Sequence, residues 1–401
     1  MSLAAWFAVG ALLLLAAAAA VTWSLAERVA RSVLVPTPYG LQSEFVLGVV
    51  EDLGRDADGR ARLRVQLPLP PAGDTRQFAR VDADGRYGLL WDDAGALAHG
   101  LLGPVEARED EAVTRTLTVV EGAAPLAGAA ARLDATLYRR DPLRDHALAF
   151  EEVDIAGPVG HIAAWWLERE TDTAVVMLHG RRRGERSEAL RALPTVAASG
   201  ASVLVSSYRN HDRSVMSPDG FFHYGASEAD DLLAALDWLR ARGVERVVLV
   251  TYSMGGALAL VALERWPGQG PALLGLTMDA PLVDPTTVFR AAAGRAGLPQ
   301  LVADAGLWLA QRRSGVDYAR LDLRNRADTL EVPLLLHATV DDGTIPIELI
   351  DAFAARVPAT LLRYRRLEHG DHVEAWNVDP QGYEAALASF LGEVLAAASG
   401  R

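Results

Sequence analysis

The residues that could do chemistry are a serine in a tight turn and the acidic and histidine side chains that follow it along the chain. Ser253 comes after an apolar run, Val247–Val250, and stands directly before Met254-Gly255-Gly256. A serine hydroxyl is a weak nucleophile unless a sharp turn presents it and a base lies beside it. A strand, a turn and a helix start provide that presentation, because small residues let the strand and the helix approach closely. Ser253 is therefore the candidate nucleophile.

Thr251 stands two residues before Ser253, where such turns usually carry glycine. A β-branched side chain at this point requires a slightly opened turn, or it marks weakened catalysis. The alternative for the whole segment is an ordinary strand-to-helix turn without chemistry.

A general base is expected late in the chain, after the last strand. Two histidines occur there, His369 and His372, in the segment LEHGDHV. His372 follows a short Gly-Asp turn and is the preferred base. His369 is the alternative, and its other role is that of a surface loop histidine.

The carboxylate that orients the base is expected between the serine and the histidine. The apolar run Val332–His337 is followed by an acidic turn with Asp341 and Asp342. A carboxylate there can accept a hydrogen bond from the imidazole and stabilise its charged form. Asp341 is the preferred acid and Asp342 the close second. Asp279, which also follows an apolar run, is a third candidate.

Two backbone amides are expected to hold the oxyanion that forms during acyl transfer. One is the N–H of Met254, the residue after the nucleophile. The other is the N–H of Arg181, in a loop where Gly180 lets the backbone turn inward. His179 is expected to be structural. Arg182, Tyr208 and Arg209 could line the same cleft and bind an anionic group, or the arginines could pair with neighbouring acids.

The elements that position these residues alternate between strand and helix from about residue 150 onward. Short apolar runs at 174–178, 202–206, 247–250, 274–278, 332–337 and 360–364 are separated by helical patterns such as 185–198, 226–242 and 383–398. This alternation predicts an α/β fold with a doubly wound, mostly parallel sheet. Such sheets bind ligands beyond the carboxyl ends of their strands, where the candidate residues lie.

Residues from about 150 to 398 resemble the α/β-hydrolase superfamily, close to its prolyl-oligopeptidase-like and lysophospholipase-like branches. The motifs that carry the resemblance are LHGR at 178–181, SYRN at 207–210, YSMGG at 252–256, MDAP at 278–281, VDDGTIP at 340–346 and DHVEAWNVDP at 371–380. The chain order Ser253, Asp341, His372 is the order of that family, and an acid four residues after His337 has its common spacing. The whole chain is also similar to a group of membrane-anchored actinobacterial α/β hydrolases. The resemblance implies acyl transfer to water through a serine ester.

Composition excludes several other classes of function. A formal net charge of −13 disfavours nucleic acid as a partner, because a phosphate backbone would be repelled. The absence of cysteine excludes disulfides and thiolate chemistry. We expect no metal and no organic cofactor.

The N-terminus predicts a membrane anchor. Leu3 to Leu25 carry no charge, and Trp6 and Trp23 lie near the two ends of the run. A cleaved signal peptide and a buried core helix are the alternatives. Arg28 and Arg31 follow the run and weakly favour a cytoplasmic main body.

The remaining segments complete the expected organisation. We expect an anchor at 1–30, a linker at 31–43, a β-rich accessory domain of structural or substrate-shaping role at 44–150, and a catalytic domain at 151–401. Within the last, 284–325 is apolar and partly helical, with Phe289, Leu298, Leu301, Leu307 and Trp308, and is either a lid or plain core.

The function expected from the sequence is a membrane-anchored serine hydrolase that cleaves a carboxylic ester of a small molecule or lipid. A serine peptidase of the prolyl-oligopeptidase-like type is the first alternative. A non-catalytic binding protein that keeps the fold is the second.

Overall fold

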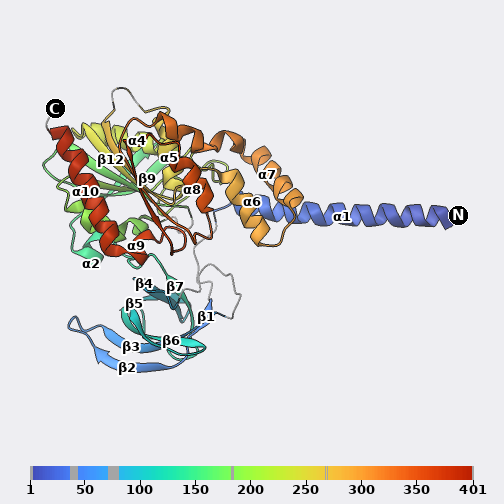
Figure 1. Ribbon diagram of the computed structural model, residues 1–401, viewed down its shortest axis with the longest axis horizontal. Helices are drawn as coiled ribbons and strands as arrows, with labels where there is room; N and C mark the ends of the chain where they lie inside the picture. The colour runs from blue at the N-terminus through green and yellow to red at the C-terminus, as the bar shows by residue number, and fades with distance from the viewer. Residues whose placement is uncertain are drawn as a thin grey trace.

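The computed structural model describes residues 3–36, 44–70, 81–181, 185–266, 268 and 270–399. Three parts follow one another along the chain (Figure 1): a long helix α1 (Leu3–Leu34), a β-rich region at residues 44–134 with its own sheet, and an α/β region at residues 151–399 with a larger sheet. Each part has a distinct relation to solvent and to the candidate site.

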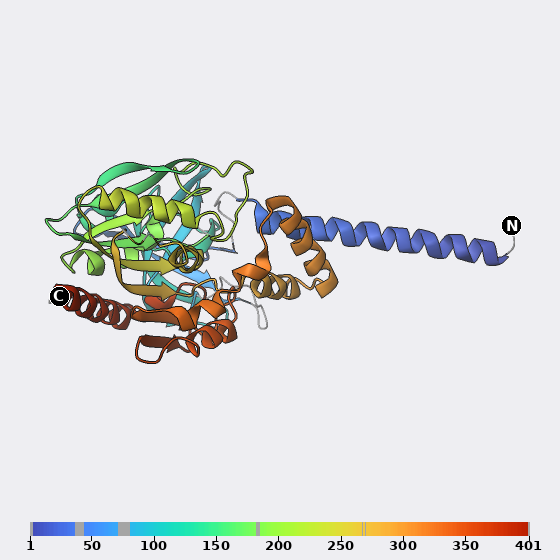
Figure 2. The ribbon, with the colours of Figure 1, turned by 90° about the horizontal axis from the view of Figure 1, so that it is seen from above.

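Helix α1 has two halves that differ in exposure. Most of the side chains described up to Trp23 are exposed, and the helix projects away from the other two parts in both views (Figures 1 and 2). From Ala26 onward one face of the helix is buried. In the described part of the chain one helix is long and apolar enough to cross a membrane, over Val9–Leu34, and a stretch of 18 residues within it has a mean hydropathy of 2.1. The expected linker start at residue 31 is therefore wrong, because the helix continues to Leu34; residues 37–43 lie outside the described residues.

The sheet of the β-rich region is antiparallel and has the order β1-β7-β4-β5-β6-β3-β2. Its strands are β1 (Phe45–Val46), β2 (Val50–Arg55), β3 (Ala61–Pro68), β4 (Tyr87–Asp93), β5 (Ala96–Arg108), β6 (Ala112–Glu121) and β7 (Ala130–Asp134). Alternate residues pack inward, among them Val65, Leu89 and Trp91. Short runs of β-forming residues at 45–50, 61–66, 87–91, 116–120 and 132–138 predict strands in this region, but no run predicts β2 or β5, since β2 is largely polar and β5 is irregular, with several shifts of register.

The larger sheet has the order β15-β14-β13-β12-β10-β11-β9-β8. Its strands are β8 (Glu151–Gly157), β9 (Gly160–Leu167), β10 (Thr173–Leu178), β11 (Ser202–Ser206), β12 (Arg246–Tyr252), β13 (Ala272–Asp279), β14 (Leu334–Thr339) and β15 (Leu362–Leu367). Strands β10 to β15 pair in parallel, whereas β8 and β9 are antiparallel. The sheet is thus mixed, and the antiparallel edge was not anticipated.

Helices bury both faces of this sheet. Along β10, Ala174 and Val176 face one core cluster, while Val175 and Met177 face another. The helical elements are α2 (Pro142–His146), η1 (Arg186–Arg191), α3 (Leu193–Ala197), α4 (Ala229–Arg240), α5 (Met254–Leu263), α6 (Pro285–Arg295), α7 (Gln300–Ser314), η2 (Tyr318–Leu321), η3 (Leu323–Thr329), α8 (Ile347–Ala354), α9 (Ala375–Val378) and α10 (Pro380–Ser399). The helix expected at 185–198 is instead a 3₁₀ turn and the short α3, because Pro194 lacks the N–H that a continuous helix would need.

Candidate active site

The turn between β12 and α5 presents Ser253 in a strained conformation. Its φ is +48°, a region that residues with a side chain seldom adopt. The turn is fixed on both sides, since the N–H of Ser253 donates to the carbonyl of Asp279 at 2.9 Å and its own carbonyl accepts from Leu282 N–H at 3.0 Å. A Cβ at Gly255 would lie 2.5 Å from the carbonyl oxygen of Leu178, so only glycine lets α5 start this close to β10. Strain of this kind is common where a nucleophile must be exposed.

Thr251 fits into the turn without exposure. Its side chain is buried, and its hydroxyl donates to the carbonyl of Thr277 at 3.0 Å on the neighbouring strand. A Cβ at Gly256 would be in ordinary contact with the threonine oxygen at 3.6 Å but only 2.8 Å from Cβ of Pro281, so the glycine is required by Pro281 and not by Thr251. The turn therefore accommodates threonine in place of glycine at position 251, because the buried hydroxyl has a hydrogen-bond acceptor.

His372 joins Ser253 to an acidic side chain. Its Nε2 lies 2.8 Å from Oγ of Ser253, and its Nδ1 lies 2.8 Å from Oδ2 of Asp342. The other carboxylate oxygen of Asp342 accepts from the N–H groups of Thr344 and Ile345 at 2.7 and 2.8 Å, which fixes the rotamer. The geometry therefore brings together three side chains of the types that can act as nucleophile, base and orienting carboxylate.

The carboxylate at His372 belongs to Asp342, not to the preferred Asp341. Asp341 lies beside His369, with Oδ2 at 3.1 Å from Nδ1, and the two side chains are 42% and 80% exposed. Successive residues of the turn point in different directions, so a shift of one position separates the buried acid from the exposed one. His369 likewise lies away from Ser253.

Asp279, the third acid considered, is buried beneath the site. Neither of its carboxyl oxygens has a hydrogen-bond partner among the described residues. Burial raises the pKa of this carboxyl to about 7. Its contribution to the nucleophile is through its backbone carbonyl, which holds the Ser253 turn.

The electrostatic setting of His372 favours the charged imidazole. Burial disfavours the charge, but the negative charge of Asp342 and its hydrogen bond outweigh burial and raise the pKa of His372 above its usual value. A base that becomes a cation during the reaction is stabilised by such a partner.

The loop after β10 lies directly against the nucleophile. A Cβ at Gly180 would be 2.9 Å from Cβ of Ser253. The N–H of Gly180 donates to Oε2 of Glu188 at 2.6 Å and is therefore occupied. The amides of Arg181 and Met254, both of which line the cavity beside Ser253, stay the candidate oxyanion donors.

A cavity of about 220 Å³ opens at Ser253. Its walls are mostly apolar and come from distant parts of the chain: Ser32, Arg181, Tyr224, Ser253, Met254, Leu282, Val288, Phe289, Ala292, Arg295, Thr344, Ile345 and His372. Helix α6 supplies four of these residues. Of the apolar residues expected at 284–325, Phe289 faces the cavity, Leu307 is buried, and Leu301 and Trp308 are exposed.

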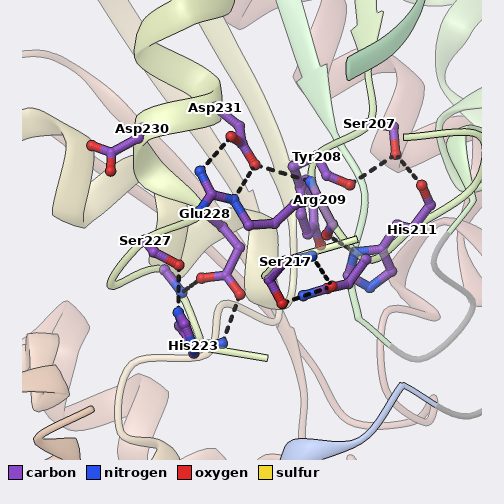
Figure 3. A network of polar contacts seen from close by, with 12 residues as sticks. Ser207, Tyr208, Arg209, His211, Ser217, His223, Ser227, Glu228, Asp230 and Asp231 are labelled. Atoms are coloured by element: carbon purple, nitrogen blue, oxygen red, sulfur yellow. Dashed lines mark hydrogen bonds and ion pairs between the residues drawn. The ribbon is translucent and has the colours of Figure 1, made fainter. Parts of the chain in front are cut away.

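Tyr208 and Arg209 do not line this cavity, which corrects the sequence-based expectation. The buried Tyr208 hydroxyl donates to the carbonyl of His179 at 2.9 Å, and the two rings stack at 4.5 Å, so His179 is structural as expected. The guanidinium of Arg209 pairs with the carboxylate of Asp231 at 2.6 Å inside the domain (Figure 3). Both were expected to face the cleft because they follow a strand, but the chain turns inward there. Arg182 lies outside the described residues.

The β-rich region contacts the loop that carries His372. Nδ2 of Asn377 donates to the carbonyls of Arg86 and Ala135 at 2.7 and 2.9 Å, and the Tyr87 hydroxyl donates to Glu374 at 3.1 Å. Asn377 and Tyr87 are both fully buried. Nothing in the sequence pattern of residues 44–150 indicated these contacts, which join segments nearly 300 positions apart.

Ser32 and Tyr224 are among the cavity residues that sequence reasoning missed. A signal for the first existed: Ala26, Val29, Ala30 and Val33 follow the uncharged run with the spacing of one helix face. That spacing predicts that the end of the helix packs against protein. All four residues are buried.

Comparisons with known proteins bear on the fold. A family model described as a domain of unknown function (DUF8805) matches residues 79–134, within the β-rich region. No curated protein sequence matches the chain. The esterase Pf2001 of Pyrococcus furiosus superposes with a TM-score of 0.52 at 20% identity, covering 64% of this chain and 94% of its own. A second crystal form of it gives a TM-score of 0.50 at 21% identity, with 64% and 96% covered.

A third similar structure is an esterase of Thermogutta terrifontis, with a TM-score of 0.44, 19% identity and coverage of 61% of this chain and 99% of its own. The first two superpositions bear on the fold alone, because the identities are 20% and 21%. The chain has the fold of the α/β-hydrolase superfamily.

Proposed function

We propose that this protein is a serine hydrolase that cleaves a carboxylic ester through an acyl-enzyme on Ser253. The observation that carries the proposal is the continuous series of short contacts from Ser253 through His372 to Asp342, at the wall of a cavity. A strained nucleophile turn supports it, because strain is retained where function requires it.

In the proposed reaction, His372 Nε2 removes the proton of the Ser253 hydroxyl as Oγ attacks the carbonyl carbon of the ester. Asp342 holds the imidazole by Nδ1 and stabilises its positive charge. The amides of Arg181 and Met254 stabilise the oxyanion. His372 then gives the proton to the leaving alcohol, and the acyl group stays on Ser253. Water attacks this acyl-enzyme by the same route and releases the acid.

The cavity supports an ester with a short apolar acyl or alkyl group. A volume of about 220 Å³ is smaller than the range typical of drug-sized ligands, roughly 300–1,000 Å³. Side chains such as Leu282, Val288 and Ile345 favour an apolar group. The names of the similar solved structures, which are esterases, also favour esters over peptides.

Membrane anchoring by α1 is part of the proposal. The exposed half of the helix carries large apolar side chains that water disfavours, including Phe7, Leu14 and Trp23 at 71%, 75% and 57% exposure. A bilayer would cover them. Arg28 and Arg31 are exposed just beyond Trp23, which favours a cytoplasmic position for the main body.

The proposal is tested by steady-state hydrolysis of p-nitrophenyl esters of increasing acyl length beside matched peptide anilides. The full-length protein in detergent should cleave the short esters fastest. Ser253→Ala should lose about 10⁶-fold in kcat, as expected for removal of a triad nucleophile. Faster cleavage of anilides than of every ester would assign a peptidase, and no turnover of either would favour a binding protein with this fold.

A further inference from the structure

The C-terminal end of α1 is built into the α/β region through its last carbonyl groups. The final carbonyls of a helix have no partner within it and need one elsewhere. Here the carbonyl of Leu34 accepts from Phe222 N–H at 2.8 Å, and those of Ser32 and Val33 accept from Nη1 of Arg181 at 3.4 and 3.3 Å. A guanidinium at this end also favours the helix dipole. The helix end and the Arg181 side chain therefore hold each other.

A tyrosine completes this contact. The hydroxyl of Tyr224 donates to the carbonyl of Val33 and accepts from the guanidinium of Arg181. The Arg181 guanidinium also lies 5.4 Å from the ring centre of Phe222 and 5.5 Å from that of Tyr224. The side chain is thus fixed on several sides, and with it the residue whose amide is a proposed oxyanion donor.

Helix α7 holds the same segment of α1 from another side. A Cβ at Gly306 would be 2.6 Å from Cβ of Val29 and 2.9 Å from the carbonyl oxygen of Ala26, so glycine allows the two helices to touch. The two terminal nitrogens of the Arg313 guanidinium, Nη1 and Nη2, donate to the carboxylate of Glu27 at 2.7 Å each. Figures 1 and 2 both show α6 and α7 beside α1 where it leaves the α/β region.

Ser32 places this helix end at the substrate. It lines the cavity together with Ser253, His372 and residues of α6. Its Oγ donates to the carbonyl of Val29 within the helix at 2.8 Å. The wall it forms is thus a side of α1 itself.

We infer that the docked segment of α1, Leu25–Leu34, is part of the active site: Ser32 limits the group that the cavity accepts, and the carbonyls of Ser32 and Val33 position the Arg181 loop. This rests on the proposed function and goes beyond it, because the apolar helix then sets specificity and rate in addition to attaching the protein. Arg181 is accordingly a positioning residue through its side chain.

The specificity claim is tested in the full-length protein with Ser32→Leu and, as a matched control, Ser24→Leu. Both are exposed serines on the same helix, but only Ser32 lines the cavity. Ser32→Leu should lower the ratio of kcat/KM for p-nitrophenyl hexanoate to that for acetate by about tenfold, since a few carbon atoms in a fitted pocket discriminate by at least that much. Ser24→Leu should leave the ratio as in the wild type. Equal ratios in the two variants would overturn the claim.

The positioning claim is tested with Arg181→Met and Arg181→Lys, using kcat per active site titrated with a fluorophosphonate. Arg181→Met removes the donors to the helix end and should lower kcat for the acetate ester by about 100-fold, the cost of a small displacement at the reacting centre. Arg181→Lys keeps a donor and should recover part of the loss. A merely structural role would reduce the number of titratable sites and leave kcat per site unchanged.

The outcomes distinguish a failure of the proposed function from a failure of the positioning role of Arg181. A wild type that neither hydrolyses esters nor reacts with the fluorophosphonate would refute the proposed function. An active wild type whose Arg181→Met variant keeps kcat per site within about twofold would refute the positioning role alone.

Discussion

Two parts of the chain outside the α/β region reach the proposed catalytic loops, and they do so by different means. The β-rich region contacts the His372 loop through buried side chains, Asn377 and Tyr87 among them. The end of α1 contacts the Arg181 loop through its terminal carbonyls, and the other half of this helix is exposed. The contact of the β-rich region is buried like a domain core, whereas the contact of α1 is made by a helix end at one side of a cavity. Damage to the first should therefore cost stability and rate together, and damage to the second should cost mainly rate or specificity.

Asp342 gives the reference loss of kcat for this comparison, because it belongs neither to the β-rich region nor to α1. Asp342→Asn keeps the shape of the side chain and removes the charge at His372 Nδ1. We expect kcat for the acetate ester to fall by about 10⁴-fold, as for loss of the orienting carboxylate in a serine triad. Asp341→Asn is the matched control and should change kcat by less than about twofold, because that side chain is 42% exposed and lies beside the exposed His369 and not beside His372. The opposite ranking would return the role to Asp341.

On the histidine side, Asn377→Ala should lower stability and kcat together. The change leaves two backbone carbonyls, one of them buried, and the guanidinium of Arg191 without the amide that they contact. We expect a loss of about 2–4 kcal/mol in the free energy of unfolding, measured by urea denaturation. Tyr87→Phe removes one hydrogen bond and should cost about 1 kcal/mol. Unchanged kcat in a destabilised Asn377→Ala would show that this support does not position His372.

For α1, substitutions at two glycines in neighbouring helices distinguish the effect of displacing the docked helix from the effect of alanine on helix stability. Gly306→Ala places a Cβ against Val29, which costs about 1–3 kcal/mol of overpacking or displaces the helix. Gly294→Ala meets no atom within 4 Å and should add up to about 1 kcal/mol of stability. We expect only Gly306→Ala to change the hexanoate-to-acetate ratio. An identical effect of both substitutions would argue against a docked helix in the working protein.

The smallest expected effect is a displaced pH profile. Since the pKa of His372 is raised from its ordinary 6.5, kcat/KM should fall as the pH drops through a midpoint above 6.5, where the base becomes protonated. The contribution of the same shift to stability runs the other way: it is full below 6.5 and is lost as pH rises through the folded pKa. In Asp342→Asn burial then dominates, so the midpoint of fluorophosphonate labelling should move to lower pH. A midpoint that does not move would mean that the protonation of a group other than His372 controls the loss of labelling at low pH.

Much of the candidate site could be predicted because its residues are marked by features of the nearby sequence. Ser253 follows from a strand, a turn and small residues, and His372 from its place after the last strand. The choice between Asp341 and Asp342 could not be made, because side-chain direction in a turn depends on hydrogen bonds, here from Thr344 and Ile345, that no spacing reveals. The buried position of Arg209 could not be predicted either, because it depends on an ion pair with Asp231, 22 positions along the chain.

The fold outside the α/β region was predicted less well. Short runs of β-forming residues indicated several strands of the β-rich region, but its contact with the His372 loop depends on pairs such as Tyr87 and Glu374 that only the folded chain brings together. The run at the N-terminus was interpreted from its hydrophobicity, its tryptophans and the arginines that follow it. The amphipathic spacing after Leu25, which predicts the docked segment, was obscured by the uncharged run before it.

The most direct test of the central claim is covalent labelling of the full-length protein by a fluorophosphonate, followed by peptide mass mapping. We expect one adduct on Ser253, absent in Ser253→Ala and formed much more slowly in Asp342→Asn, while Asp341→Asn should be labelled as the wild type is. An unlabelled wild type, or an adduct on a different residue, would contradict it.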